Sequence, residues 1–318
     1  MDNVPLGRTD LWVTRYCQGT AFRHLGRHAD DPMAEAVLRH ALDAGVNFFD
    51  SAYGWGGSEQ LLGKVLEGRR DDVVICTKVP PSLKPVNDNA SGETATFTLS
   101  YLTNQLDAAL KRLRTDYIDL YLLHQPDRVT SAEAICVSMD RFVRTGKIRY
   151  WGVSNHEANE VSACLDAAHQ AGTYPPVVTE DYYTIAGYAL TREGHKSRVR
   201  KLENELFPVL REQRLGLIAF SPMDAGRLSP SYTAAPDSPL AALHASLDKA
   251  AGTLGVTRAQ VCVAWVLAHP EVTSVLAGPE HPEHVDEILA ALAIDLPDEI
   301  RKNLDAAGLR YSREIERP

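Results

Sequence analysis

Short apolar segments alternate with amphipathic helices about eight times along this chain, and this alternation limits its fold more than any other feature. The apolar segments are rich in β-branched residues, which is typical of strands buried on both faces. Repeated strand–helix units predict a parallel sheet wrapped by helices, and eight units predict a closed (β/α)₈ barrel, the TIM barrel. We expect strands at residues 11–21, 46–49, 73–78, 117–123, 148–153, 177–180, 215–220 and 272–276.

The helices are predicted from their periodicity and from the residues that start and stop them. Asp31 is the expected N-cap of the first helix, Pro32 occupies its first position, and Gly45 ends it. Ser58 is expected to cap the helix after the second strand. We expect helices at residues 32–42, 59–66, 99–114, 132–144, 158–171, 198–211, 241–254, 258–268 and 282–292, and an extra C-terminal helix at 298–307.

A single domain over residues 1–318 is predicted, because no long linker divides the chain. An open doubly wound sheet is the alternative, but no GxGxxG motif follows the first strand. Residues 80–95 are rich in proline, asparagine and glycine and are expected to form a long functional loop. The basic run at residues 195–201 is expected to be the solvated start of a helix, with an approach to a cofactor or substrate phosphate as the alternative.

Charge and cysteine content exclude several classes of partner. The formal net charge of −9 disfavours a nucleic-acid partner, because phosphate binding needs a basic surface. No apolar run is long enough to span a membrane and no signal peptide is evident, so we expect a cytoplasmic protein without a membrane partner. The five cysteines are scattered and form no CxxC motif, which favours free thiols, and we expect no metal site.

Reactive side chains stand at the ends of several predicted strands. They are Asp50, Lys78, His124 and the pair Ser154–Asn155. Taken singly, each is most simply explained as a solvated strand end or a satisfied buried group. The carboxyl ends of barrel strands meet at one face, however, and active sites form there from several strands. The coincidence of these residues at successive strand ends therefore predicts an active site.

Longer motifs surround these residues and extend through most of the chain. They are Asp43–Asp50, Tyr53–Glu59, Thr77–Lys78, Asp119–Asp127, Gly146–Asn155 and Phe220–Pro222. In these motifs the chain resembles the aldo-keto reductases, which are NAD(P)H-dependent carbonyl reductases built on a (β/α)₈ barrel. The resemblance implies a catalytic tetrad of Asp50, Tyr53, Lys78 and His124.

The residue types of this tetrad suit hydride transfer to a carbonyl, which builds negative charge on the carbonyl oxygen. Tyr53 is expected to donate the proton, although an unperturbed phenol has a pKa of about 10. Lys78, held charged by Asp50, would stabilise the phenolate. His124 would orient the carbonyl oxygen by a hydrogen bond, and Trp55 and His124 are expected to contact the substrate.

The resemblance also implies a cofactor site. Ser154 and Asn155 are expected at the nicotinamide carboxamide. Glu180 stands where the family commonly has a glutamine, and Phe220 stands where a tyrosine often stacks on the ring. The residues assigned to the cofactor are Gly19, Thr20, Asp50, Ser154, Asn155, Glu180, Phe220, Ser221, Pro222, Gly278, His284 and Glu287.

NADP(H) is the expected cofactor, with NAD(H) as the alternative. The family often has arginine or lysine at the position of Glu280 and asparagine at the position of Ile288. Such a cation would pair with the adenosine 2′-phosphate, which Glu280 would repel. Glu287 matches the acidic residue on the adenine side.

The turn after Asp50 departs from the family pattern. The family tyrosine usually follows the aspartate by five residues, but Tyr53 follows Asp50 by only three. A two-residue deletion aligns Tyr53 with the family tyrosine, whereas an ungapped alignment puts Trp55 in its place. An indole has no acidic hydroxyl. We favour the first alignment, because glycine turns tolerate deletions.

Three functions are compatible with these residues. The first is interconversion of a carbonyl (an aldehyde, ketone or sugar) and an alcohol by hydride transfer. The second is a cofactor-binding or regulatory barrel with little turnover, as the Trp55 alignment implies. The third is a barrel lyase or epimerase that uses Lys78 and His124 without net redox change. The specific substrate depends on loop conformations, and it and the oligomeric state are not assigned from the sequence.

Overall fold

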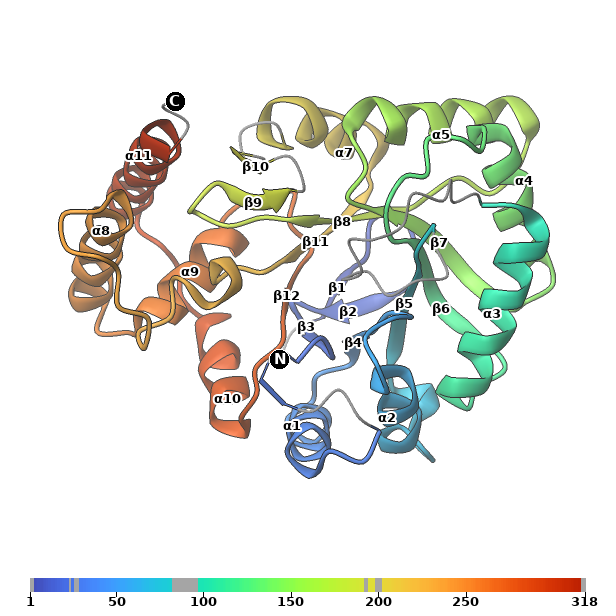
Figure 1. The fold of residues 1–318 in the computed structure, drawn as a ribbon, viewed down its shortest axis with the longest axis horizontal. Coiled ribbons are helices and arrows are strands. Elements are labelled where there is room, and N and C mark those ends of the chain that lie inside the picture. The colour runs from blue at the N-terminus through green and yellow to red at the C-terminus, as the bar shows by residue number, and fades with distance from the viewer. Residues whose placement is uncertain are drawn as a thin grey trace.

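Eight parallel strands form a closed barrel at the centre of the molecule (Figure 1). The structure is a computed structural model that describes residues 3–22, 24–25, 29–81, 97–191, 194–197 and 202–315. β12 pairs with β3 and closes the barrel, so the predicted (β/α)₈ architecture is confirmed. In order around the barrel, the strands are β3 (Tyr16–Gly19), β4 (Phe48–Asp50), β5 (Val74–Val79), β6 (Ile118–Leu123), β7 (Ile148–Ser154), β8 (Val178–Tyr182), β11 (Gly216–Phe220) and β12 (Ser274–Ala277).

Helices surround the barrel, and most of their bounds lie close to the predicted ones, although the helix predicted at 198–211 begins at Phe207, after a π-helical segment at Leu202–Leu206. They are α1 (Pro32–Asp43), α2 (Ser58–Val65), α3 (Leu99–Leu113), α4 (Ala132–Arg144), α5 (Ala158–Ala171), α7 (Phe207–Gln213), α8 (Pro239–Leu254), α9 (Arg258–Leu267), α10 (Pro282–Ala291) and α11 (Asp298–Ile315), with short turns η1 (Arg70–Asp72), η2 (Leu202–Leu206) and η3 (Asp224–Gly226). Asp31 caps α1 as predicted, because its carboxylate accepts the N–H groups of Met33 and Ala34, both at 2.9 Å.

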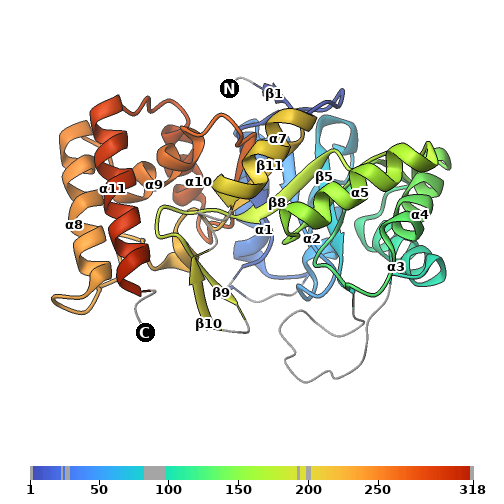
Figure 2. The same ribbon diagram turned by 90° about the horizontal axis from the view of Figure 1, so that it is seen from above.

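The extra C-terminal helix lies outside the ring of helices. α11 packs beside α8, as both ribbon views show (Figure 2), and it extends to Ile315 rather than to residue 307. Among the described residues, no single helix is both long and apolar enough to cross a membrane. Only α8 and α9 taken together reach that length and composition, and the pair is bent by 91°.

Three local predictions are wrong. Residues 11–21 are not one strand, because β2 (Trp12–Thr14) pairs antiparallel with β1 (Asn3–Pro5) and the barrel strand β3 begins at Tyr16. Ser58 is the first residue of α2 rather than its cap, and its Oγ lies 3.0 Å from Ser51 Oγ instead. Residues 195–197 do not start a helix, because they belong to β10 (Gly194–Ser197), which pairs antiparallel with β9 (Tyr188–Thr191). Residues 198–201, and residues 82–95 of the predicted loop, lie outside the described residues.

The apolar core has two layers, one inside the barrel and one between the strands and the helices. Leu6, Leu11 and Val13 of the β1–β2 hairpin join the inner layer, so the hairpin covers the amino-terminal end of the barrel. Burial of the strands on both faces explains why they appear in the sequence as continuous apolar runs rather than as alternating patterns.

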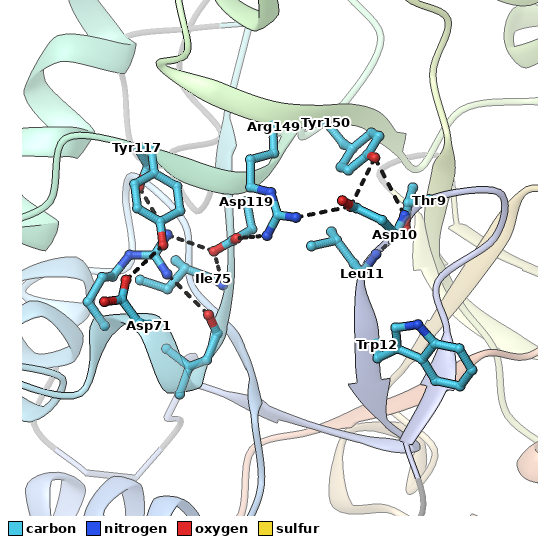
Figure 3. Close-up of polar contacts among 12 residues, drawn as sticks. Thr9, Asp10, Leu11, Trp12, Asp71, Ile75, Tyr117, Asp119, Arg149 and Tyr150 are labelled. Atoms are coloured by element: carbon cyan, nitrogen blue, oxygen red, sulfur yellow. Dashed lines mark hydrogen bonds and ion pairs between the residues drawn. The ribbon is translucent and has the colours of Figure 1, made fainter.

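An ion-pair network centred on Asp119 ties the hairpin to the barrel (Figure 3). The buried Asp119 carboxylate accepts hydrogen bonds from Arg70 at 2.6 Å, from Arg149 at 3.0 Å and from the backbone N–H of Ile75 at 3.0 Å. Arg149 also binds Asp10, in the segment between β1 and β2, at 3.0 Å. Because Asp119 stands at the start of β6, this network lies at the end of the barrel opposite the strand carboxyl ends.

Replacing Asp119 with alanine is expected to destabilise the fold by about 3 kcal/mol, because two guanidinium groups and a backbone N–H lose their acceptor. Urea unfolding of the wild type and Asp119→Ala measures this change. Asp71→Asn is the matched control, since exposed Asp71 contacts only the Tyr117 hydroxyl of this network, at 3.4 Å. The control is expected to stay within about 0.5 kcal/mol of the wild type. Equal stabilities of Asp119→Ala and the control would contradict the prediction.

Candidate active site

Two carboxylates hold Lys78 at the carboxyl end of the barrel. Its ammonium lies 2.5 and 2.6 Å from the two oxygens of Asp50 and 3.2 Å from Oε1 of Glu180. It also donates to the backbone carbonyl of Ser51 at 3.2 Å. The three charged residues come from β4, β5 and β8, and all are buried. The structure therefore brings together Asp50 and Lys78, as expected, and adds Glu180 as a second partner of the lysine.

Burial penalises each charge of this cluster, and the ion pairs decide which charges persist. Burial lowers the pKa of Lys78, but Asp50 and Glu180 outweigh this effect and the pKa is raised. Burial, and then the charge of Asp50, raises the pKa of Glu180 well above its usual value. Burial also raises the pKa of Asp50, against the attraction of Lys78. Because both oxygens of Asp50 contact the ammonium, the arrangement favours an ionised Asp50 beside a protonated Glu180.

The same cluster contains the donor atoms of a potential metal site. Asp50, Cys76 and Glu180 offer ligand atoms that all lie within 4.8 Å of one another. Lys78 already places a positive charge against both carboxylates. The donor set therefore binds an ammonium group, and we assign no metal to it.

His124 follows β6 and is neutral at physiological pH. Burial, and then the charge of Lys78, lowers the pKa of His124 to about 3. Its Nδ1 is buried and makes no hydrogen bond to any described residue. A neutral imidazole has one donor and one acceptor nitrogen, so His124 can donate a hydrogen bond to a carbonyl oxygen without carrying charge.

Trp55 rather than Tyr53 covers Lys78. The Lys78 ammonium lies 4.6 Å from the centroid of the Trp55 ring, and this ring meets the His124 ring edge-on at 5.8 Å. The Tyr53 ring lies instead 4.9 Å from the guanidinium carbon of Arg112 on α3. These contacts correspond to the alignment with Trp55 in the tyrosine's place, and the acid role of Tyr53 stays a prediction.

Ser154 and Asn155 stand beside His124. Asn155 Nδ2 donates to the backbone carbonyl of His124 at 3.1 Å and lies 2.9 Å from Ser154 Oγ. Asn155 has φ of 61°, in the left-handed region that asparagine tolerates better than most residues. The ends of β6 and β7 are thus joined by the residues expected at the nicotinamide carboxamide.

The other residues assigned to the cofactor near the strand ends have structural contacts of their own. Thr20 donates to the backbone carbonyl of Asp50 through both its N–H and its Oγ1, each at 3.0 Å. A Cβ at Gly19 would lie 3.2 Å from the carbonyl oxygen of Ala277, so β3 and β12 approach closely there. The half-buried Phe220 ring meets the Tyr182 ring edge-on at 5.4 Å.

Ser221 and Pro222 continue the chain beyond β11. Ser221 has φ of 59°, and the Pro222 carbonyl accepts a hydrogen bond from Thr184 at 3.0 Å. Tyr182 donates a short hydrogen bond to Asp224 of η3, a buried residue for which the sequence offered no signal.

The residues expected on the adenine side make no described contact with the Lys78 cluster. Glu287, on α10, accepts a hydrogen bond from Thr257, the N-cap of α9, at 2.5 Å. The His284 ring meets the His281 ring edge-on at 5.4 Å. Gly278 follows β12, and near it Glu280 accepts the backbone N–H of His24 at 2.6 Å.

Behind the turn that carries Tyr53 and Trp55 lies a network that sequence reasoning missed. Glu59 of α2 is buried, and its carboxylate binds Thr77 of β5 at 2.7 Å and Arg112 of α3 at 2.6 Å. The available signal was the position of Glu59 inside a motif, since a buried carboxylate requires partners.

The closed barrel and the buried lysine–carboxylate cluster at its strand carboxyl ends define a (β/α)₈-barrel protein with a candidate active site at that end. Residues 17–308 match the family model of the Aldo/keto reductase family, and the chain belongs to this family of oxidoreductases. It is 32% identical to the uncharacterized oxidoreductase YrpG of Bacillus subtilis, over 96% of this chain and 95% of that protein. It is 29% and 28% identical to probable voltage-gated potassium channel beta subunits of Oryza sativa subsp. japonica and Arabidopsis thaliana. Each of these alignments covers 91% of this chain and 90% of the relative.

The low pKa of His124, about 3, makes stability depend on pH. The unfolded imidazole takes up a proton below about pH 6.5, whereas the folded one resists it. Stability present above the unfolded pKa is therefore lost as the pH falls from there toward the folded pKa. The free energy of unfolding, measured in urea at several pH values, is expected to fall less steeply with decreasing pH in His124→Asn than in the wild type. The two slopes are expected to differ by up to about 1.4 kcal/mol per pH unit. Identical slopes would contradict a buried, neutral His124.

Proposed function

We propose that the protein is an NAD(P)H-dependent oxidoreductase that interconverts a small-molecule carbonyl and an alcohol. The observation that carries this proposal is the buried Lys78 ammonium, paired with Asp50 and Glu180 and lying near a neutral His124 at the strand carboxyl ends. Such a site offers a fixed positive charge and a neutral hydrogen-bond donor where negative charge develops on a carbonyl oxygen. A lyase or epimerase would need a base with a pKa near neutrality, whereas Lys78 is held charged and the pKa of His124 is lowered to about 3.

The residues near the cluster suit a nicotinamide cofactor. Glu180 Oε2 is buried and has no hydrogen-bond partner among the described residues, so a protonated Glu180 can donate a hydrogen bond to the carboxamide oxygen. Ser154 and Asn155 offer further polar groups, and Phe220 offers an aromatic face for stacking. When bound, the cofactor supplies or accepts the hydride.

The chain's own residues would orient the carbonyl and exclude water. His124 is proposed to donate a hydrogen bond to the carbonyl oxygen, and Trp55 to form one wall of the substrate pocket. Lys78 is proposed to favour the negative charge that develops on that oxygen. Tyr53 is the acid proposed from the sequence, and for that role its ring must leave Arg112 and approach Lys78, because a general acid acts only within hydrogen-bond reach.

A second candidate function is a cofactor-binding barrel with little turnover. The contact of Trp55 with Lys78, at 4.6 Å, favours it, because an indole lacks an acidic hydroxyl where the proton is needed. The relatives from Oryza sativa and Arabidopsis thaliana are named as probable potassium channel beta subunits, and the name describes those proteins. For this chain we propose no channel partner. We propose a cytoplasmic, single-domain protein without a nucleic-acid partner, in keeping with its net charge of −9.

Trp55→Tyr is expected to raise the turnover number for carbonyl reduction by about 100-fold, because it puts a phenol next to Lys78. Steady-state kinetics on a panel of aldehydes, ketones and sugars with NADH and NADPH measure the change. Trp55→Phe is the matched control, since it opens the same space without a hydroxyl. A loss of similar size in Tyr53→Phe, with no gain in Trp55→Tyr, would instead identify Tyr53 as the acid. Failure of the wild type to bind either nucleotide would reject both candidate functions.

The choice between NADP(H) and NAD(H) is proposed to depend on the charge of Glu280. NADP(H) follows from the family, whereas Glu280 would repel a 2′-phosphate. We therefore expect Glu280→Arg to tighten NADPH binding about tenfold relative to NADH, because it removes one repulsive charge pair near the ligand and adds one attractive pair. Tryptophan fluorescence titration measures both affinities. Glu280→Gln is the control, because it removes the repulsion and can retain the acceptor for the His24 N–H. An unchanged ratio in Glu280→Arg would place the 2′-phosphate elsewhere.

A further inference from the structure

The turn between β4 and α2 presents two aromatic side chains to opposite sides of the barrel wall, each against a cation. Trp55 faces the barrel interior and covers Lys78 at 4.6 Å, whereas Tyr53 faces the helix layer and lies 4.9 Å from Arg112. Gly54 and Gly56 adopt φ of 95° and 60°, which only glycine adopts readily. The orientation of the two rings is thus a property of the turn as a unit.

Arg112 is the group that holds the Tyr53 side of this turn. Its Nε donates to the buried carboxylate of Glu59 at 2.6 Å, and that carboxylate also accepts the hydroxyl of Thr77 at 2.7 Å. Thr77 precedes Lys78 on β5 and carries the network to the strand that holds the charged cluster. A continuous chain of contacts therefore runs from β5 through Glu59 to the guanidinium and the Tyr53 ring.

The packing of α2 against the end of α3 limits how far Arg112 can move. A Cβ at Gly63 of α2 would lie 2.6 Å from the carbonyl oxygen of Leu113, so the helices approach too closely for any larger residue. Arg112 Nη2 is buried and has no hydrogen-bond partner among the described residues. The ion pair with Glu59 leaves this Nη2 without a partner. The face of the Tyr53 ring offers the guanidinium a second favourable contact, a cation–π interaction.

We infer that Arg112 is a positioning residue that decides which aromatic side chain of the turn faces Lys78. By holding Tyr53 in the helix layer, Arg112 keeps Trp55 over the ammonium. The effect of Arg112 on turnover rests on the proposed function. Which ring faces Lys78, however, can be measured in the protein without cofactor or substrate. Loss of the Arg112–Tyr53 contact frees the turn, so Trp55 loses its fixed contact with Lys78 and Tyr53 can approach the cluster.

The test measures the position of Trp55 directly, in the full-length protein without ligand. The variants are Arg112→Met, Tyr53→Leu and the double variant, each prepared with and without Trp55→Phe. Subtracting each pair of emission spectra isolates Trp55 from Trp12, Trp151 and Trp265. Arg112→Met alone leaves the buried Glu59 carboxylate without its ion-pair partner and can prevent folding. Arg112→Met combined with Glu59→Gln avoids this unpaired carboxylate, and Tyr53→Leu keeps the Arg112–Glu59 ion pair. The test therefore does not depend on the folding of Arg112→Met alone.

We expect acrylamide quenching of Trp55 to rise by about twofold or more in both single variants, because an indole released from a cation contact becomes more exposed. The double variant is expected to resemble the single variants, since both break the same contact. Trp55 emission and quenching that match the wild type in folded Tyr53→Leu would overturn the inference. So would additive effects of the two substitutions, because Arg112 would then act without Tyr53.

Steady-state turnover measurements test the same variants independently of Trp55 fluorescence. Arg112→Met with Glu59→Gln is expected to change the turnover number while the KM for the nucleotide stays constant, and Arg112→Lys is expected to restore part of the wild-type behaviour. If Trp55 moves as expected but no variant reduces any carbonyl, the proposed function fails and the positioning role stands. If turnover changes while Trp55 stays in place, the positioning role fails and the proposed function stands.

Discussion

The buried ammonium of Lys78 is the interaction on which the mouth of this barrel depends. A lysine removed from water keeps its charge only if carboxylates compensate for the lost hydration, and here Asp50 and Glu180 do so from two other strands. Two carboxylates against one ammonium leave one negative charge in excess, and burial together with the charge of Asp50 raises the pKa of Glu180, which favours a proton there. A proton on Glu180 would make the net charge of the cluster zero. The closed barrel holds its three residues together, because they come from three different strands.

The two ends of the barrel use charge differently. At the amino-terminal end, Asp119 is surrounded by two partly exposed arginines, and its contacts join the hairpin to the strands. At the carboxyl end, Lys78 is fully buried and its neighbours His124 and Glu180 have polar atoms without partners in the described structure. Polar groups that have hydrogen-bond partners stabilise the fold, whereas buried polar atoms without partners are available to bind a ligand. The asymmetry agrees with the division in such barrels between a stabilising face and a reactive face.

Periodicity was sufficient to predict the barrel and most helix bounds, whereas the pairing of Asp50 with Lys78 was expected from the resemblance to the aldo-keto reductases. Strands that are buried on both faces consist of continuous apolar runs, which can be recognised in the sequence. Asp31 before Pro32 likewise indicates where α1 begins. The β1–β2 hairpin was missed because β2 ends only two residues before β3 and the two strands appear as one segment in the sequence. The β9–β10 hairpin was missed because the sequence of β10, Gly-His-Lys-Ser, has no apolar run or alternation typical of a strand. The partnership of Glu180 with Lys78 depends on contacts between strands far apart in sequence, which no local pattern records.

The turn after Asp50 shows most clearly where sequence reasoning ends. Alignment weighs Tyr53 against Trp55 by counting residues, but the direction of each side chain depends on glycines with positive φ and on cations supplied by β5 and α3. An aromatic ring gains from either cation, so ring chemistry alone does not choose between the two positions. Arg112 is held by an ion pair at 2.6 Å with the buried carboxylate of Glu59. The long-range ion pair therefore determines which ring reaches the site, and with it whether a phenol or an indole faces Lys78.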